Sequence, residues 1–208
     1  MSVDEVKLSR KGKLIIVAGI NGVGKTTVLN SVKQLTKEIE VVNYGDEMFS
    51  IASQRGWVQN RDQIRKLPLE RQLLLQKEAA QNLSLKAKEK NIIVDTHVLI
   101  PTPSGAWPGL PKWVVESLAP DIIVILEAPP DVIFMRRNLD KLRERKDQSS
   151  IEEIRTFMEL IRAAAIASAV LVGAAVVIVQ NIEGDPSFAA KEIVRTPLTR
   201  GCHRFFKL

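Results

Sequence analysis

Residues 13–27 read KLIIVAGINGVGKTT and carry much of the information about the fold of this 208-residue chain. After the lysine, an unbroken apolar and mostly β-branched run is typical of a strand buried on both faces of a parallel sheet. Residues 19–26 then follow the spacing G-x-x-x-x-G-K-[ST], in which glycines let the backbone curl around a phosphate with its N–H groups pointing inward. The next residues, TTVLNSVKQL, indicate a helix whose positive end faces the same anion.

Two side chains of this predicted loop have the chemistry that a nucleoside triphosphate with magnesium requires. Lys25 supplies a mobile cation for the β- and γ-phosphates, and the Thr26 hydroxyl is a ligand for Mg²⁺, the expected cofactor. A glycine-rich turn between a strand and a helix is the weaker alternative. The residues that we expect to bind ATP are Gly19, Ile20, Asn21, Gly22, Val23, Gly24, Lys25, Thr26 and Thr27.

The rest of the chain alternates short apolar runs with longer amphipathic stretches. The candidate strands are residues 13–18, 40–43, 92–95, 122–127 and 174–180, and the candidate helices are residues 25–37, 69–90, 111–119, 131–140, 150–172 and 186–194. This alternation predicts a three-layer α/β domain of the P-loop type, with a five-stranded parallel sheet flanked by helices. We assign residues 1–194 to this single domain and residues 195–208 to a basic C-terminal tail.

The net charge of +6 raises the question of a nucleic-acid ligand. Four of these charges come from the tail, which contains no acid, so the domain itself is nearly neutral. A nucleic-acid partner is therefore not favoured. We expect the tail to be a flexible terminus, with docking through Phe205 and Phe206 as the alternative.

Cysteine usage and hydropathy favour a cytoplasmic protein. The chain has one cysteine, Cys202, which cannot form an internal disulfide, and its first residues lack the apolar core of a signal peptide. The longest apolar run, residues 163–179, is short for a membrane span. We interpret it as a helix that ends at Gly173, followed by a buried strand.

An acidic residue ends the third candidate strand. An aspartate that ends a strand next to the first one faces the metal in phosphate-loop folds, usually through water, and Asp95 fits that place. The alternative is a cap or loop carboxylate. His97 either contacts a phosphate or, the interpretation that we prefer, is a loop histidine with its hydrogen bonds satisfied.

Six cations crowd the segment before the long helix: Arg136, Arg137, Lys141, Arg143, Arg145 and Lys146. Such a run is usually a solvated helix face. Phosphoryl transfer, however, needs cations that neutralise charge on the migrating group, and a mobile lid that excludes water. We predict a short lid at about residues 136–149, with Arg137, Arg143 and Arg145 as catalytic residues. Arg162 lies at the edge of an apolar stretch and needs a partner, for which phosphate is a candidate.

Several separated motifs resemble those of archaeal adenylate kinases, which are nucleoside monophosphate kinases with a phosphate loop. They are GINGVGKTTV at 19–28, VNYGDEM at 42–48, RDQIRKL at 61–67, DTH at 95–97, TPSG at 102–105, PGLP at 108–111, ILEAPP at 125–130, ASAVLVGA at 167–174 and NIEGDPSFAA at 181–190. The resemblance covers residues 13–194 and implies Mg²⁺-dependent, reversible transfer of phosphate from ATP to AMP, giving two ADP. It also implies a homotrimer.

The resemblance assigns further residues. It implies that Tyr44, Gly45 and Asp46, with the helix after them, shape the AMP site, and that Arg65 stands on a short helical segment behind. It places Thr102 and Gly105 in the same site. It places Arg162 opposite the lid arginines, and we take Arg162 and Lys25 as catalytic.

Two other functions stay open at this point. The first is a kinase for another nucleoside monophosphate or a small hydroxyl compound, because the residues that read the base cannot be found from spacing. The second is a nucleotide-dependent RNA-binding protein. A phosphate oxygen of AMP is already anionic at neutral pH, so the proposed transfer needs no general base.

Overall fold

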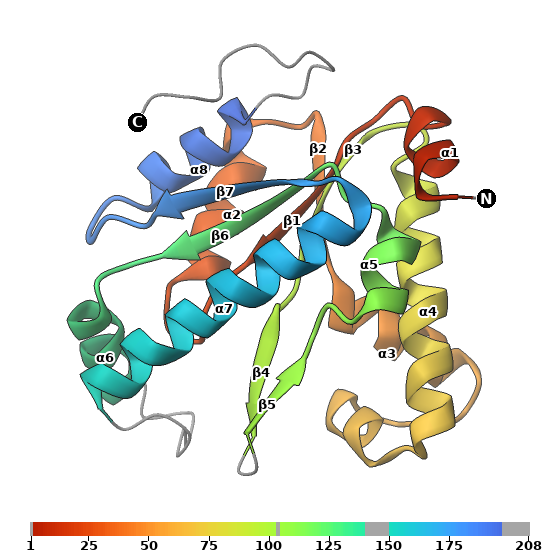
Figure 1. Cartoon of the computed structure of the whole chain (residues 1–208), viewed down its shortest axis with the longest axis horizontal. Coiled ribbons are helices and arrows are strands. Elements are labelled where there is room, and N and C mark those ends of the chain that lie inside the picture. Colours follow the sequence, from red (N-terminus) through yellow and green to blue (C-terminus); the bar gives the residue numbers. More distant parts are fainter. Residues whose placement is uncertain (1, 103–104, 140–149, 197–208) are drawn as a thin grey trace.

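The computed structural model describes residues 2–102, 105–139 and 150–196. Its centre is a five-stranded parallel sheet with the strand order β2-β3-β1-β6-β7 (Figure 1). The strands are β1 (Leu14–Ala18), β2 (Ile39–Asn43), β3 (Asn91–Asp95), β6 (Ile122–Glu127) and β7 (Ala175–Gln180). Each strand begins and ends within one residue of the range predicted from sequence, so the predicted sheet is confirmed.

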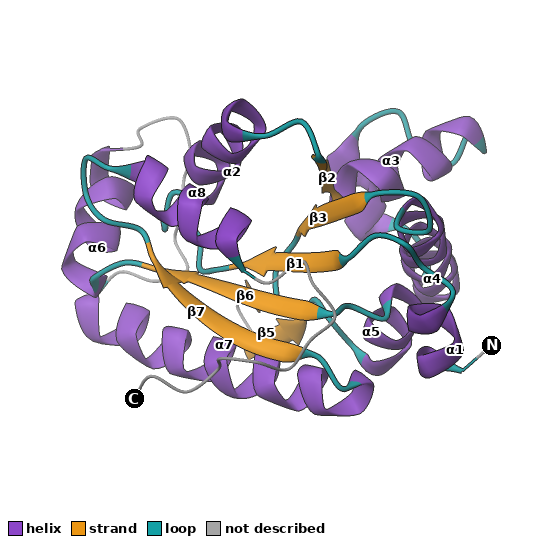
Figure 2. Ribbon diagram, turned by 90° about the horizontal axis from the view of Figure 1, so that it is seen from above, coloured by secondary structure: helices purple, strands orange, loops and turns teal. Residues whose placement is uncertain are grey.

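Helices cover both faces of the sheet, as predicted. They are α1 (Val3–Leu8), α2 (Lys25–Leu35), α3 (Tyr44–Gln54), the 3₁₀ helix η1 (Arg61–Lys66), α4 (Leu69–Lys86), α5 (Lys112–Leu118), α6 (Pro130–Leu139), α7 (Ile151–Val172) and α8 (Pro186–Arg195). Helices α2 and α8 cover one face, whereas α4, α5 and α7 lie along the other (Figure 2). None of the described helices is both long enough and apolar enough to cross a membrane.

Strand β1 lies between β3 and β6, and all of its residues are buried. The register pairs Val17 with Asp95, and Asp95 in turn with Asn43 at the end of β2. Because parallel strands end at the same edge of a sheet, the loop after β1 and these two polar side chains meet there.

Three parts of the fold were missed by the periodicity analysis. The first is the six-residue helix α1, and the second is the hairpin of β4 (Leu99–Thr102) and β5 (Gly105–Pro108). The third is α3, which the resemblance placed after Asp46 but which begins at Tyr44. It begins there because the side chain of Asn43 accepts a hydrogen bond from the Asp46 N–H at 3.2 Å and so caps the helix.

Three predicted boundaries need correction. Helix α2 ends at Leu35 rather than at residue 37, because Thr36 has an extended backbone. Helix α4 ends at Lys86 rather than at residue 90, because the next carbonyls, of Ala87 and Lys88, accept hydrogen bonds from the segment that leads into β1. Helix α8 ends at Arg195, one residue beyond its predicted end at residue 194.

The strand after Gly173 is not buried as predicted. Gly173 does end α7, in the left-handed conformation with φ of 58°. Strand β7, however, is the edge strand, so only β6 pairs with it in the described sheet, and Ile178 is 48% exposed. An apolar run predicts burial on the two faces of a sheet but carries no information about its edges.

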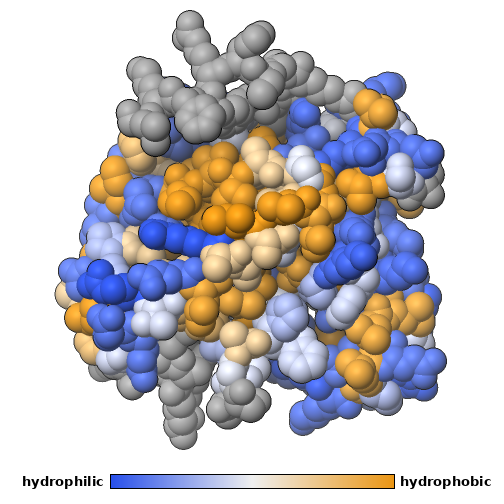
Figure 3. Space-filling model, in the orientation of Figure 1, coloured by the Kyte–Doolittle hydropathy of each residue, from blue (hydrophilic) through white to orange (hydrophobic). Residues whose placement is uncertain are grey.

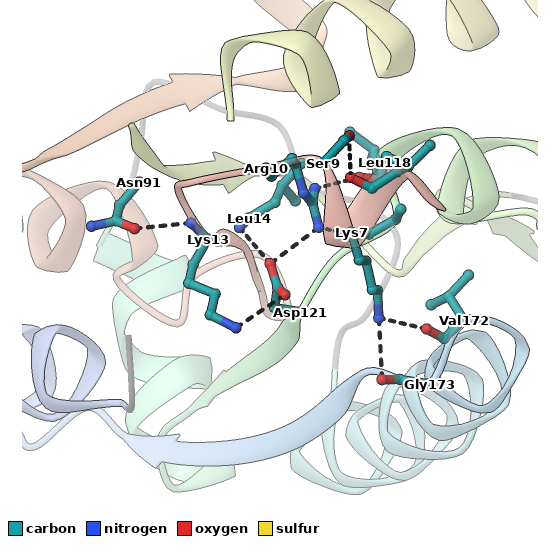
Figure 4. A network of polar contacts seen from close by, with 12 residues as sticks. Lys7, Ser9, Arg10, Lys13, Leu14, Asn91, Leu118, Asp121, Val172 and Gly173 are labelled. Carbon is teal, nitrogen blue, oxygen red and sulfur yellow. Dashed lines mark hydrogen bonds and ion pairs between the residues drawn. The ribbon is translucent and has the colours of Figure 1, made fainter. Parts of the chain in front are cut away.

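A polar network lies at the amino-terminal edge of the sheet (Figure 4). Asp121, just before β6, accepts hydrogen bonds from Arg10, Lys13 and the Leu14 N–H. Arg10 is buried and also donates to two carbonyls at the end of α5. Lys7 of α1 donates to two carbonyls at the end of α7. The network therefore joins the N-terminal helix to two helices of one layer.

Candidate active site

The predicted phosphate loop connects β1 to α2. Gly22 and Gly24 have φ angles of 88° and 92°, which only glycine adopts without strain. A Cβ on Gly19 would lie 2.7 Å from the backbone oxygen of Leu126 on β6. Helix α2 begins at Lys25 without a side-chain cap, which leaves its first N–H groups for an anion.

Two arginines of α6 and one asparagine bind backbone carbonyls of this loop. Arg137 donates from Nε and Nη2 to the carbonyl of Asn21, at 2.9 and 2.6 Å. Arg136 and Asn181 both donate to the carbonyl of Val23, at 2.9 and 2.7 Å. Because these three side chains bind its carbonyls, the loop has a defined shape before any ligand arrives. Arg143 and Arg145, the other predicted lid arginines, lie outside the described residues.

Lys25 forms an ion pair with Asp95 at the end of β3. The two side chains are largely shielded, with 12% and 17% exposed. The sequence placed these residues in one site but did not predict the pair. A charged lysine held by a carboxylate beside an uncapped helix start is ready to exchange that carboxylate for a phosphate.

The ion pair continues into a chain of hydrogen bonds toward α3 and η1. Asn43 donates from Nδ2 to Asp95 Oδ2 at 2.8 Å. Arg61 donates from Nη2 to Asn43 Oδ1 at 2.9 Å and from Nη1 to Asp46 Oδ1 at 2.6 Å. The chain thus runs from Lys25 in the phosphate loop to Asp46 in the predicted AMP site.

The predicted AMP residues fall into three groups: residues 44–46 at the start of α3, the hairpin residues, and Arg65. Gly45 and Asp46 lie together, and the Arg61 guanidinium occupies the space into which a side chain on Gly45 would project. Tyr44 is buried, and its hydroxyl donates to the Gln76 carbonyl at 2.6 Å; burial raises its pKa. It therefore packs α3 against α4.

Thr102 and Gly105 are paired residues next to the tip of the β4–β5 hairpin, with Thr102 Oγ1 2.9 Å from the Gly105 carbonyl oxygen. Arg65 is exposed, and its guanidinium makes no hydrogen bond or ion pair to the described part of the chain. Arg61, which sequence reasoning missed, contacts both Asn43 and Asp46. The RDQIRKL motif offers two arginines, and spacing alone did not show which one turns toward α3.

Arg162 has a protein partner, which the sequence did not predict. It makes two hydrogen bonds of 2.6 Å to Glu127 at the end of β6, and this pairing raises the pKa of Arg162. The Glu127 side chain is only 3% exposed, whereas that of Arg162 is 45% exposed. The pair fixes the guanidinium near the carboxyl edge of the sheet and leaves part of it open to solvent.

His97 follows Asp95 in the same loop. Burial, and then the charge of Lys25, lower its pKa to about 4, although the charge of Asp95 and a hydrogen bond to the Gly19 backbone oppose this shift. The imidazole is therefore neutral at neutral pH. The bond to Gly19 supports the interpretation of His97 as a loop histidine with a structural partner.

The oxygen atoms at this edge suit a magnesium ion that arrives with a nucleotide. Mg²⁺ keeps several waters and takes one or two protein oxygens together with substrate phosphates. Thr26 and Asp95 supply such oxygens, and the described residues contain no cluster of three or more His, Cys, Asp or Glu that could hold a metal by itself. The donor set therefore fits Mg²⁺ bound largely by phosphate and water.

Fold and site together define a P-loop phosphotransferase. Residues 18–155 match the family described as "AAA domain". The chain is 50% identical to an adenylate kinase of Sulfurisphaera tokodaii over 193 residues, which covers 89% of this chain and all of that protein. It is 46% identical to an adenylate kinase of Methanocaldococcus jannaschii, covering 88% and 97% of the two chains. The chain therefore belongs to the adenylate kinase family, and the predicted resemblance is confirmed.

Solved structures with little sequence similarity share the fold. Shikimate kinase from Acinetobacter baumannii superposes with a TM-score of 0.58 at 16% identity, covering 91% of this chain and 95% of that one. A tunicamycin resistance protein from Deinococcus radiodurans superposes with a TM-score of 0.55 at 15% identity, covering 91% and 98%. These similarities concern the architecture alone.

Proposed function

We propose that this chain is an adenylate kinase that moves the γ-phosphoryl group of ATP to AMP and returns two ADP. The observation that carries the proposal is the 50% identity to a whole adenylate kinase. The polar chain from Lys25 to Asp46 supports it, because it links the ATP side of the site to the predicted AMP side.

In the transfer, an anionic oxygen of AMP forms a bond to the γ-phosphorus while the bond from that phosphorus to the β–γ bridging oxygen breaks. ADP leaves on one side and ADP forms on the other, and no proton has to move. Catalysis then depends on in-line positioning and on neutralising charge. In this proposal Lys25 leaves Asp95 and Arg137 leaves the Asn21 carbonyl for the phosphates. Arg162 approaches from α7, and Arg143 and Arg145 complete the set.

We propose Mg²⁺ as the cofactor, with Thr26 as a direct ligand and Asp95 as a ligand through water. When bound with ATP, the ion neutralises charge on the phosphate oxygens. On the acceptor side, we propose that Gly45, Asp46, Thr102, Gly105 and Arg65 form the AMP site, with Tyr44 supporting α3. Arg61 joins them, because its guanidinium already lies beside Gly45 and its contact with Asp46 can be exchanged for one with a phosphate.

A homo-oligomer, a trimer by resemblance, is part of the same proposal. An apolar band crosses the face of the molecule formed by α7 and β7 (Figure 3). Its members include Ile166 (54% exposed), Val170 (76%), Leu171 (50%) and Ile178 (48%). Exposed apolar patches next to a free sheet edge mark association surfaces. We also propose a cytoplasmic location, where both nucleotides are available.

A coupled assay for ADP tests the proposed function. The enzyme is given ATP with AMP, CMP, UMP or GMP, each with and without Mg²⁺. We expect ADP only with Mg²⁺, and fastest with AMP. A faster reaction with another monophosphate would redefine the acceptor, and salt-sensitive RNA binding without any ADP would instead favour a nucleotide-dependent RNA-binding protein.

A further inference from the structure

Asn43 lies between the two halves of the site. It is the last residue of β2, and the strand register pairs it with Asp95. Its side-chain amide makes three hydrogen bonds: Oδ1 accepts from the Asp46 N–H and from Arg61, and Nδ2 donates to Asp95. The carboxylate of Asp95 only accepts and the guanidinium of Arg61 only donates, so the orientation of the amide is determined.

Asp95 and Arg61, the two side chains bonded to Asn43, serve different substrates in the proposed function. This inference rests on that function. The second oxygen of Asp95 holds Lys25, which we assign to ATP. The second terminal nitrogen of Arg61 holds Asp46, which we assign to AMP. The Lys25 and Asp95 side chains are 12% and 17% exposed, whereas those of Arg61 and Asp46 are 53% and 67% exposed. Asn43 therefore connects a shielded pair to a solvated one.

Two contacts must change during the reaction, because Lys25 and Arg61 turn to phosphates. They are the Lys25 contact with Asp95 and the Arg61 contact with Asp46. The contacts of Asn43 with Asp95 and Arg61 can then persist and hold these residues at a fixed separation. We propose that Asn43 is a positioning residue that aligns the donor and acceptor sides and couples ATP binding to AMP binding. Small errors in such alignment are costly in turnover.

The substitution Asn43→Asp removes one of these contacts, the hydrogen bond to Asp95. Aspartate keeps the oxygen that caps α3 and accepts from Arg61, but it loses the donor to Asp95 and places a charge beside it. Asn82→Asp is the matched control, because Asn82 also donates from Nδ2 to a carboxylate, that of Glu47, at 3.2 Å. Asn82 has no proposed role in the reaction.

We measure kcat, the affinity for AMP and for a non-hydrolysable ATP analogue separately, and the change in AMP affinity that the analogue causes. For Asn43→Asp we expect kcat to fall at least about tenfold, while the separate affinities change by less than about threefold. The mutual effect of the ligands, expected to be at least about fivefold in the unsubstituted protein, should disappear. Asn82→Asp should keep both the kcat and the mutual effect of the two ligands.

The melting temperature separates positioning from folding. Asn43→Asp should melt within about 4 °C of the unsubstituted protein, because the helix cap remains. Unchanged kcat and coupling in Asn43→Asp, equal losses in Asn82→Asp, or no coupling in the unsubstituted protein would each overturn the inference. If the unsubstituted protein makes no ADP, the proposed function fails, and the coupling measurement alone decides whether Asn43 links the two ligand sites.

Discussion

At the scale of single residues, the main finding is that several cations of the site already have anionic or carbonyl partners. Lys25 pairs with Asp95, and Arg162 pairs with Glu127. Substrate phosphates must therefore displace or join these partners. The exchange is inexpensive, because one charge-assisted contact replaces another in a partly shielded place.

Replacing Lys25 by alanine tests its proposed role. We expect Lys25→Ala to lower turnover at least about 100-fold, as removal of one transition-state donor does. The rate of ADP formation measures this, with Lys33→Ala, on the exposed side of α2, as the control that should keep its rate. A near-normal rate for Lys25→Ala would mean that another cation takes its place.

His97 predicts a specific pH dependence of stability. Its pKa is about 4 in the folded protein and about 6.5 when unfolded, so between these values the unfolded chain binds more protons. The free energy of unfolding should therefore fall as the pH falls from about 6.5 to about 4, by at most about 3 kcal/mol from this residue. Above pH 6.5 this contribution is fully present.

Urea unfolding at several pH values checks this prediction. His97→Asn replaces the imidazole with an amide, which still has an N–H donor but does not titrate. We expect its stability to fall less than that of the unsubstituted protein over the same interval. Parallel pH curves for the two proteins would show that His97 does not contribute.

How far a site residue could be predicted depended on how local its signal is. Gly22, Gly24 and Lys25 act within one loop, and their spacing alone specified their placement. Arg61 acts across a contact between η1 and α3, which no local pattern reveals. Its neighbour in the motif, Arg65, was chosen instead and stays a prediction.

At the scale of elements, buried strands were predicted well because burial on both faces leaves an unbroken apolar run. The hairpin was missed because β4 and β5 each contain a proline, and their residues are only partly buried or exposed. The apolar periodicity did not reveal helix α3, which only the resemblance implied, because it starts without a loop, directly where β2 ends. The exposure of β7 depends on strand order, which arises from tertiary packing.

The Asp121 network should contribute strongly to stability. Asp121→Ala would leave Arg10, whose side chain is 1% exposed, without its carboxylate partner. We expect a loss of about 3 kcal/mol in the free energy of unfolding, because a buried guanidinium loses its ion pair with Asp121. Chemical denaturation measures the loss.

A solvated ion pair nearby provides the control. Lys11 and Glu89 are 81% and 77% exposed, so Glu89→Ala should cost less than about 1 kcal/mol. Turnover at a temperature where all proteins are folded should be the same for both variants. A small loss for Asp121→Ala would show that the other contacts of Arg10 are enough to hold its charge.

At the scale of the whole molecule, the described residues leave the apolar face of α7 and β7 exposed. A charge on the outer strand should prevent a second copy from packing there. We expect the unsubstituted protein to be a homo-oligomer, and Ile178→Lys to be a monomer, in light scattering coupled to size-exclusion chromatography.

Leu85→Lys is the matched control, since Leu85 is 54% exposed and belongs to α4, a helix that lies apart from β7 (Figure 1). It should leave the oligomer intact. A monomeric unsubstituted protein, or an oligomer that tolerates Ile178→Lys, would mean that this face does not mediate assembly.

The Asp121 network and the phosphate loop stand at opposite ends of β1. That strand has five residues, so the two clusters are separated by roughly 16 Å. Substitutions around Asp121 can therefore shift the temperature at which the protein melts without touching the groups that handle phosphate. A lineage moving to a hotter or cooler habitat could adjust heat resistance and reaction speed one at a time.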